Sequence, residues 1–127
     1  MSEPPPDVVL LATGWRPRAL LRAQLIEQGF EVVATNSWPM MRRHLRPGMK
    51  PHLAIVDVQG LPDPFTVLAD LRVLMKPEQV LVLTALGTVP VAEVERLGFH
   101  ALQRPITIED VVRTAARLIR SHPVHTQ

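Results

Sequence analysis

The chain has 127 residues, the size of one domain, and 46% of them are hydrophobic, enough for a full core. It has no cysteine, which excludes disulfides and thiolate metal sites, and no apolar run approaches the ~20 residues of a membrane span. The formal net charge is only +2, with arginines far outnumbering lysines.

The sequence begins with a proline-rich stretch over residues 1–6, which we expect to be a flexible tail and not a signal peptide. A cytoplasmic protein is therefore expected. The apolar run over 8–13 has the length of a buried strand and stops at Gly14. Pro17 suits the first turn of a helix that ends at Gly29. The apolar positions of this helix are Leu21, Leu25 and Ile26.

A second strand is predicted over 30–34, followed by a helix that Ser37 and Pro39 open and that stops before Pro47. This helix carries Trp38, Met41 and Leu45 on one side. The same helix also contains the densest basic stretch of the chain, at 42–46. Aromatic residues that could stack bases are nearly absent there, which favours a solvated helix face over a nucleic-acid surface.

The second half repeats the alternation. A strand over 53–56 precedes a helix capped by Asp63, and a strand over 80–84 precedes a short helix that starts near Thr88 and ends at Gly98. The first of these helices carries Phe65, Leu68, Leu71 and Met75. A fifth strand over 100–103 precedes a last helix. Thr107 and Asp110 form a capping-box pattern at its start. Its core positions are Ile108, Val111, Val112, Ala115, Leu118 and Ile119.

Five strands thus alternate with five helices, and the first, third and fourth strands are apolar on both faces, as in a sheet covered on both sides. The pattern predicts an α/β domain over residues 7–121, a flavodoxin-like doubly wound (βα)5 fold with a five-stranded parallel sheet in the order 2-1-3-4-5. Residues 122–127 are expected to form a C-terminal tail or linker stub.

In such sheets the functional crevice lies at the carboxyl ends of the strands. The third strand delivers Asp57 to this edge, the fourth delivers Thr84 and the fifth delivers Arg104. A carboxylate, a hydroxyl and a cation therefore meet at one place.

The sequence resembles the receiver domain of bacterial two-component response regulators over roughly residues 7–121. The motifs that carry the resemblance are "LAIVD" at 53–57, "VLVLTA" at 80–85 and "GFHALQRPITIEDVV" at 98–112. The resemblance implies that Asp57 stands at the phosphoacceptor position, Thr84 at the switch hydroxyl and Arg104 at the conserved lysine. It also implies a cis peptide bond before Pro105.

The chain departs from the receiver pattern where the family binds Mg²⁺. The acidic pair at the end of the first strand falls on Ala12 and Thr13, and the proline after the phosphoacceptor is shifted by one residue, to Pro62. Since Mg²⁺ needs carboxylates to displace its waters, neither this metal nor another cofactor is expected. We expect Arg104 to pair with Asp57 through two hydrogen bonds, and Thr84 to donate to the same carboxylate or to stay free.

These departures favour a degenerate receiver, or pseudo-receiver, that acts in signal transduction as a phosphorylation-independent protein-interaction module. The alternative is a working receiver phosphorylated on Asp57 in a two-component phosphorelay, with an atypical metal-poor site. A nucleotide or flavin binder, and a DNA-binding role for the basic stretch at 42–46, are weaker alternatives. No nucleophile and base are spaced for catalysis, so no enzyme is predicted.

Protein partners are expected: a histidine kinase, an output domain or a second copy, with nucleic acid and membrane disfavoured. The face expected to bind them is the one that receivers commonly use, formed by the fourth helix, fifth strand and fifth helix. On this face Glu93 and Glu95 are expected to complement basic residues of the last helix across a symmetric interface. Those basic residues are Arg113, Arg117 and Arg120.

Overall fold

The computed structural model describes residues 4–121, which form a five-stranded parallel sheet in the order β2-β1-β3-β4-β5. The predicted fold class and strand order are confirmed. The strands are β1 (Val8–Leu11), β2 (Val32–Thr35), β3 (Leu53–Asp57), β4 (Val80–Thr84) and β5 (His100–Gln103). The helices are α1 (Trp15–Glu27), α2 (Trp38–Arg42), α3 (Pro64–Leu74), α4 (Val91–Arg96) and α5 (Ile108–Ser121), with a short 3₁₀ turn η1 (Pro77–Gln79) before β4. Residues 122–127 and the first three of the expected N-terminal tail lie outside the described part of the chain.

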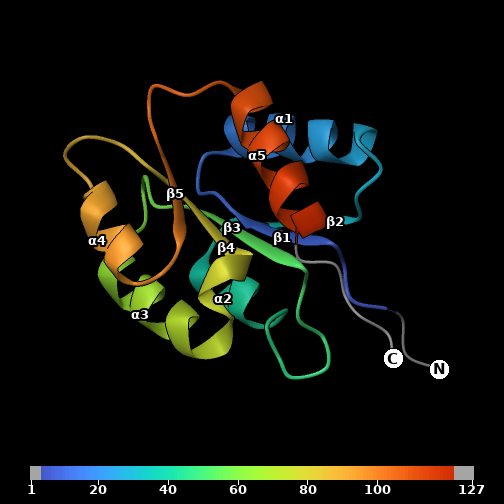
Figure 1. Ribbon diagram of the computed structural model, residues 1–127, viewed down its shortest axis with the longest axis horizontal. Helices are drawn as coiled ribbons and strands as arrows, with labels where there is room; N and C mark the ends of the chain where they lie inside the picture. The colour runs from blue at the N-terminus through green and yellow to red at the C-terminus, as the bar shows by residue number, and fades with distance from the viewer. Residues whose placement is uncertain (1–3, 122–127) are drawn as a thin grey trace.

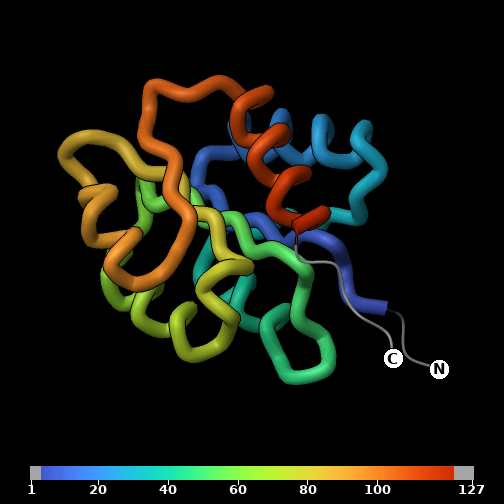
Figure 2. The backbone as a smooth tube through the Cα atoms, in the orientation of Figure 1, coloured from blue at the N-terminus to red at the C-terminus, as the bar shows by residue number. Residues whose placement is uncertain are grey.

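The sheet separates two helical layers, with α1 and α5 on one face and α2, α3 and α4 on the other (Figure 1). Figure 2 shows the chain returning through a helix after each strand, so that every strand runs in the same direction. Alternation along β1 explains why both faces are apolar: Val8 and Leu10 pack toward α1 and α5, while Val9 and Leu11 pack toward the other layer.

The helices start at the capping residues that the sequence contains. Asp63 Oδ1 accepts a hydrogen bond from the Thr66 backbone N–H, and Ser37 Oγ accepts one from the Met40 N–H. At α5 the capping box forms in both directions, because Thr107 Oγ1 accepts from the Asp110 N–H and Asp110 Oδ2 accepts from the Thr107 N–H.

Some sequence-based details are wrong. Ile26 and Phe65 are 43% and 56% exposed, so these two positions are not part of the core. The second strand ends one residue later than predicted, at Thr35, whose buried hydroxyl donates to the Leu10 carbonyl at 2.8 Å. Within residues 4–121 no helix is both long enough and apolar enough to cross a bilayer.

Candidate functional site

The candidate site lies at the carboxyl edge of the sheet, where β3 ends on Asp57. The strand is buried along its whole length, and Asp57 itself is only 5% exposed. Its Oδ1 accepts a hydrogen bond from the Gln59 backbone N–H at 3.0 Å, which fixes the carboxylate over the turn that follows. A buried carboxylate needs a cation or further donors to replace its lost water.

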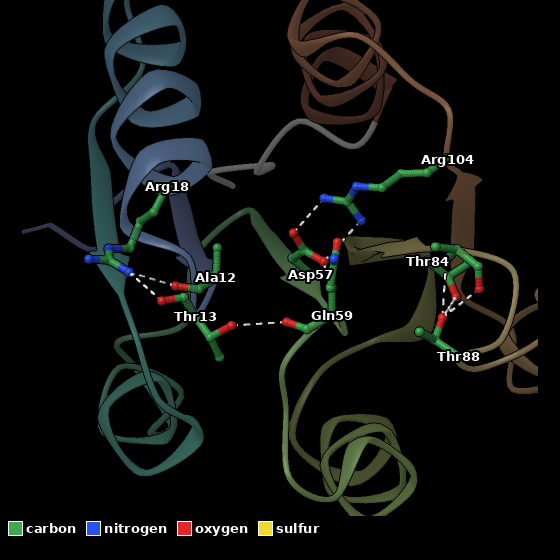
Figure 3. A network of polar contacts seen from close by, with 9 residues as sticks. Ala12, Thr13, Arg18, Asp57, Gln59, Thr84, Thr88 and Arg104 are labelled. Atoms are coloured by element: carbon green, nitrogen blue, oxygen red, sulfur yellow. Dashed lines mark hydrogen bonds and ion pairs between the residues drawn. The ribbon is translucent and has the colours of Figure 1, made fainter.

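Arg104 supplies that cation from the end of β5. Its Nη1 donates to Asp57 Oδ1 at 3.1 Å and its Nη2 donates to Oδ2 at 2.6 Å, a two-point pairing visible in Figure 3. The Arg104 backbone N–H also donates to the Thr84 carbonyl, which extends the β4–β5 pairing and sets the direction in which the side chain leaves. The expected pairing of Arg104 with Asp57 is present, and the Arg104–Pro105 peptide bond is cis, as expected.

Thr84 has a different role from the one expected. Its hydroxyl neither contacts the carboxylate nor stays free, because it bonds Thr88 Oγ1 at 2.8 Å and donates to the Val89 carbonyl. Thr88 Oγ1 in turn accepts from the Ala85 N–H and lies 2.6 Å from the Ala85 carbonyl oxygen. Figure 3 shows the two threonines facing each other, apart from Asp57 and Arg104. The expectation was wrong because the loop after β4 offers the hydroxyl nearer partners.

At the end of β1, the positions of the family's acidic pair hold no anion. Ala12 is buried and contributes only a methyl group and its carbonyl. Thr13 Oγ1 donates to the Gln59 carbonyl at 3.0 Å, which ties the β1–α1 loop to the β3–α3 loop. Gly60 packs onto the same threonine, since a Cβ at that position would lie 2.3 Å from Thr13 Oγ1.

Arg18 is the site residue that the sequence reasoning missed. From the first turns of α1 its Nη1 donates to the Ala12 carbonyl at 2.8 Å and to the Thr13 carbonyl at 3.3 Å (Figure 3). The carbonyls that end β1 are therefore bound by a cation. No sequence signal marked this residue, because its role depends on how α1 is rotated about its axis.

The residues at this edge do not fit Mg²⁺. This ion prefers six oxygen ligands at near-ideal octahedral positions. Both Asp57 oxygens are bound to Arg104, the Gln59 carbonyl accepts from Thr13, and Arg18 adds a second positive charge nearby. Across residues 4–121 no three His, Asp or Glu side chains gather as a metal site would require.

A cavity of about 150 Å³ adjoins the pair of Asp57 and Arg104. Its remaining lining is largely apolar and comes from β1, α1 and the start of α5. One wall of the cavity is therefore formed by two charged side chains, whose opposite charges neutralise each other.

The residues of the face expected to bind partners lie in both helical layers. Arg113, Arg117 and Arg120 line a groove between α1 and α5 together with Gln24 and Gln28. The helix α4 packs on the opposite face of the sheet. Within one molecule the α4 glutamates therefore do not face these arginines, and their complementarity across a symmetric interface between two copies stays a prediction. In addition, Arg96 forms an ion pair with Glu93, and Arg113 pairs with Asp110 at 3.4 Å.

Comparison with solved structures shows which proteins share this fold. A signal receiver domain of a putative LuxO repressor protein from Vibrio parahaemolyticus matches with a TM-score of 0.77, 20% identity, and coverage of 93% of this chain and 92% of the other. The receiver domain of the Francisella response regulator 1452 matches with a TM-score of 0.76, 17% identity, and coverage of 93% and 99%. An adenylate cyclase from Rhodopirellula baltica matches with a TM-score of 0.75, 20% identity, and coverage of 91% and 87%.

No family model matches the sequence, and no curated protein matches it. The structural matches nevertheless agree with one another, since most are response-regulator receiver domains. The chain has the receiver-domain fold.

Proposed function

We propose that this chain is a degenerate receiver, a pseudo-receiver, that acts in signal transduction as a cytoplasmic, phosphorylation-independent protein-interaction module. Its partners are proteins: a histidine kinase, an output domain or a second copy. It performs no catalysis of its own. The receiver fold supports a place in a response-regulator pathway, and the geometry around Asp57 supports the loss of phosphotransfer.

The observation that carries this proposal is the two-point pairing of Arg104 with Asp57. To attack a phosphoryl donor, a carboxylate oxygen must present a free lone pair to phosphorus. Here Oδ2 is bound to a guanidinium at 2.6 Å, and Oδ1 accepts from both Arg104 and the Gln59 N–H. Attack requires this buried pair to separate, which leaves a desolvated carboxylate beside an apolar cavity.

Charge stabilisation is the second requirement for phosphoryl transfer. The negative charge on the transferring group is normally neutralised by a metal ion. We propose that Mg²⁺ does not bind at this edge, because Ala12 and Thr13 provide no carboxylate and Arg18 covers the adjacent carbonyls. Arg104 does not place a compact point charge as a lysine does, and both of its Nη atoms are bound to Asp57.

Mass spectrometry after incubation with acetyl phosphate and Mg²⁺ tests the proposal. The intact protein is expected to keep its mass, as is the Asp57→Asn variant. Arg104→Lys is the matched variant that tests the two-point pairing itself, because it removes this pairing and keeps the positive charge. A stable gain of one phosphoryl group by the wild-type chain, absent in Asp57→Asn, would establish the alternative, a working phosphoacceptor.

Metal binding is tested separately. Trp15 is 71% exposed at the start of α1 and reports on the β1–α1 loop. Its fluorescence is expected to stay constant up to ~5 mM Mg²⁺, a range in which ordinary weak carboxylate sites begin to fill. A saturable change that is lost in Asp57→Ala would contradict the proposed absence of a metal site.

A further inference from the structure

The net positive charge of the chain comes from one segment. Residues 32–56 contain four of the fourteen Lys and Arg residues and none of the twelve Asp and Glu residues. This segment therefore has a formal charge of +4, and the rest of the chain, with ten cations against twelve anions, has −2. The four cations, Arg42, Arg43, Arg46 and Lys50, lie at the end of α2 and in the loop before β3, so this charge lies on one side of the molecule.

Two hollows lie next to each other on this side and share Trp38 and Pro39 as a common wall. The first, the apolar hollow, has a volume of about 400 Å³ and lies between the starts of α2 and α3. Besides the shared wall, its lining includes Thr13, Leu61, Pro62 and Val67. The second, the basic hollow, has a volume of about 410 Å³ and continues along α2. Besides the shared wall, its lining includes Arg42, Arg43, Arg46 and Leu74.

No carboxylate of residues 4–121 forms an ion pair with the arginines of the basic hollow. Arg42, Arg43 and Arg46 are exposed, and within residues 4–121 none of the three takes part in an ion pair. This contrasts with Arg96, Arg104 and Arg113, each of which pairs with a carboxylate. A negatively charged partner is the complement that this surface lacks.

The apolar hollow results from the same loop that departs from the receiver pattern. The β3–α3 loop lies against Thr13, held by the bond from Thr13 Oγ1 to the Gln59 carbonyl and by the close approach of Gly60. On its other side this loop presents Leu61 and Pro62 to the hollow. The substitution that removes the metal ligand thus helps to form a wall for an apolar side chain.

We propose that the two hollows together bind an acidic segment of a protein partner, with one apolar side chain seated in the apolar hollow and carboxylates placed against the arginines of the basic hollow. This inference rests on the proposed function, because it names the partner chemistry of the interaction module. It assigns that role to the face of α2 and α3.

A protein segment fits this surface better than a nucleic acid does. Asp63 lines the apolar hollow and would repel a phosphate group placed there. Trp38 is the one aromatic residue shared by the hollows, whereas single-stranded nucleic acids are held by successive stacking side chains. An apolar anchor beside a charged rim is instead the usual arrangement of a protein interface.

The test is selection of a random dodecapeptide library displayed on phage against the full chain. Selected peptides are expected to combine Asp or Glu with a nearby aliphatic or aromatic residue. A synthetic peptide of the consensus is then titrated, with Trp38 fluorescence as the readout in a Trp15→Phe background. Binding is expected to weaken about tenfold in Arg42→Ala/Arg46→Ala, and to weaken as salt screens the charges.

The control removes two exposed arginines elsewhere, in Arg22→Ala/Arg120→Ala, and is expected to bind as the wild type does. Three outcomes would overturn the inference: selected peptides without acidic residues, equal losses in the two double variants, or tighter binding of a single-stranded thymidine oligonucleotide than of the peptide. Peptide binding after acetyl phosphate treatment separates the two proposals. A phosphorylated Asp57 with unchanged peptide binding rejects the proposed function alone, while an unmodified chain that selects no acidic peptide rejects this inference alone.

Discussion

In the ion pair between Asp57 and Arg104, removing Arg104 is expected to lower the free energy of unfolding more than removing the charge of Asp57. The Asp57 side chain is only 7% exposed, whereas the Arg104 side chain is 28% exposed. In Arg104→Met the carboxylate stays buried and keeps the hydrogen bond from the Gln59 N–H, and we expect a loss of ~2–3 kcal/mol in the free energy of unfolding. In Asp57→Asn the amide oxygen still accepts from Gln59, and the guanidinium can turn to water, so we expect a loss of ~1 kcal/mol.

The double variant Asp57→Asn/Arg104→Met completes the cycle. With neither charge present, it is expected to be more stable than Arg104→Met alone, which corresponds to a coupling free energy of ~1–2 kcal/mol. Urea unfolding followed by circular dichroism measures all four proteins, and equal slopes against urea confirm that the unfolded states are comparable. For a domain of this size each kcal/mol also moves the melting temperature by ~3–5 °C.

The reasoning would be refuted if the two single variants lost the same stability within ~0.5 kcal/mol, or if their losses simply added in the double variant. Additivity would mean that the two side chains do not interact in solution. The proposed masking of Asp57 would then lose its physical basis.

Three further variants test other features. Gly60→Ala is expected to lower the free energy of unfolding by ~1–2 kcal/mol, since Gly60 has φ of +82° and a Cβ would meet Thr13 Oγ1. Adding Thr13→Ala should recover only the part of this loss that comes from the steric clash. An unchanged loss in the Thr13→Ala background would contradict the contact. Hydrogen bonds from the Thr107 backbone N–H, and then from its side chain, lower the pKa of Asp110, so this carboxylate stabilises the fold above its ordinary pKa and loses that effect as pH falls through the lowered one. The wild type should have a higher melting temperature than Asp110→Asn near neutral pH and should lose this advantage in strong acid. A difference in melting temperature that does not change with pH would contradict the role given to Asp110. Ile26→Ser should cost less than ~1 kcal/mol in urea unfolding despite the apolar spacing, because Ile26 is 43% exposed, and a larger loss would mean that it packs in solution.

The fold was accessible from sequence because its signals are local. Continuous apolar runs of strand length, as at β1, β3 and β4, are typical of strands buried on both faces. Residues such as Asp63 and Thr107 mark helix starts through hydrogen bonds to the backbone of the first turn. The convergence of Asp57 and Arg104 follows from strand order alone, since parallel strands bring their carboxyl ends to one edge.

The rest depends on orientation, which a linear pattern does not contain. Arg18 reaches the carbonyls of β1 only because of the rotation of α1 about its axis. The side of α5 that carries Arg113 and Arg117 is set by the phase of the helix against the sheet, which placed them toward α1 and away from α4. Phe65 is exposed for the same reason. Helical spacing shows which side of a helix is apolar, but it does not show how many residues on that side are buried.

The hydrogen bonds of Thr84 have a consequence for communication across the domain. Two sites are allosterically coupled only if some element has two arrangements that both sites bias. The loop after β4 satisfies the Thr84 hydroxyl internally, through Thr88 and Val89, and among residues 4–121 no hydrogen bond joins this hydroxyl to Asp57. The start of α4 is therefore positioned by its own loop. A change of charge at Asp57 reaches Thr84 through Arg104, whose backbone N–H donates to the Thr84 carbonyl, and not through the Thr84 hydroxyl. Because that hydroxyl is held by its own loop, we expect the coupling free energy between Asp57 and the start of α4 to be small.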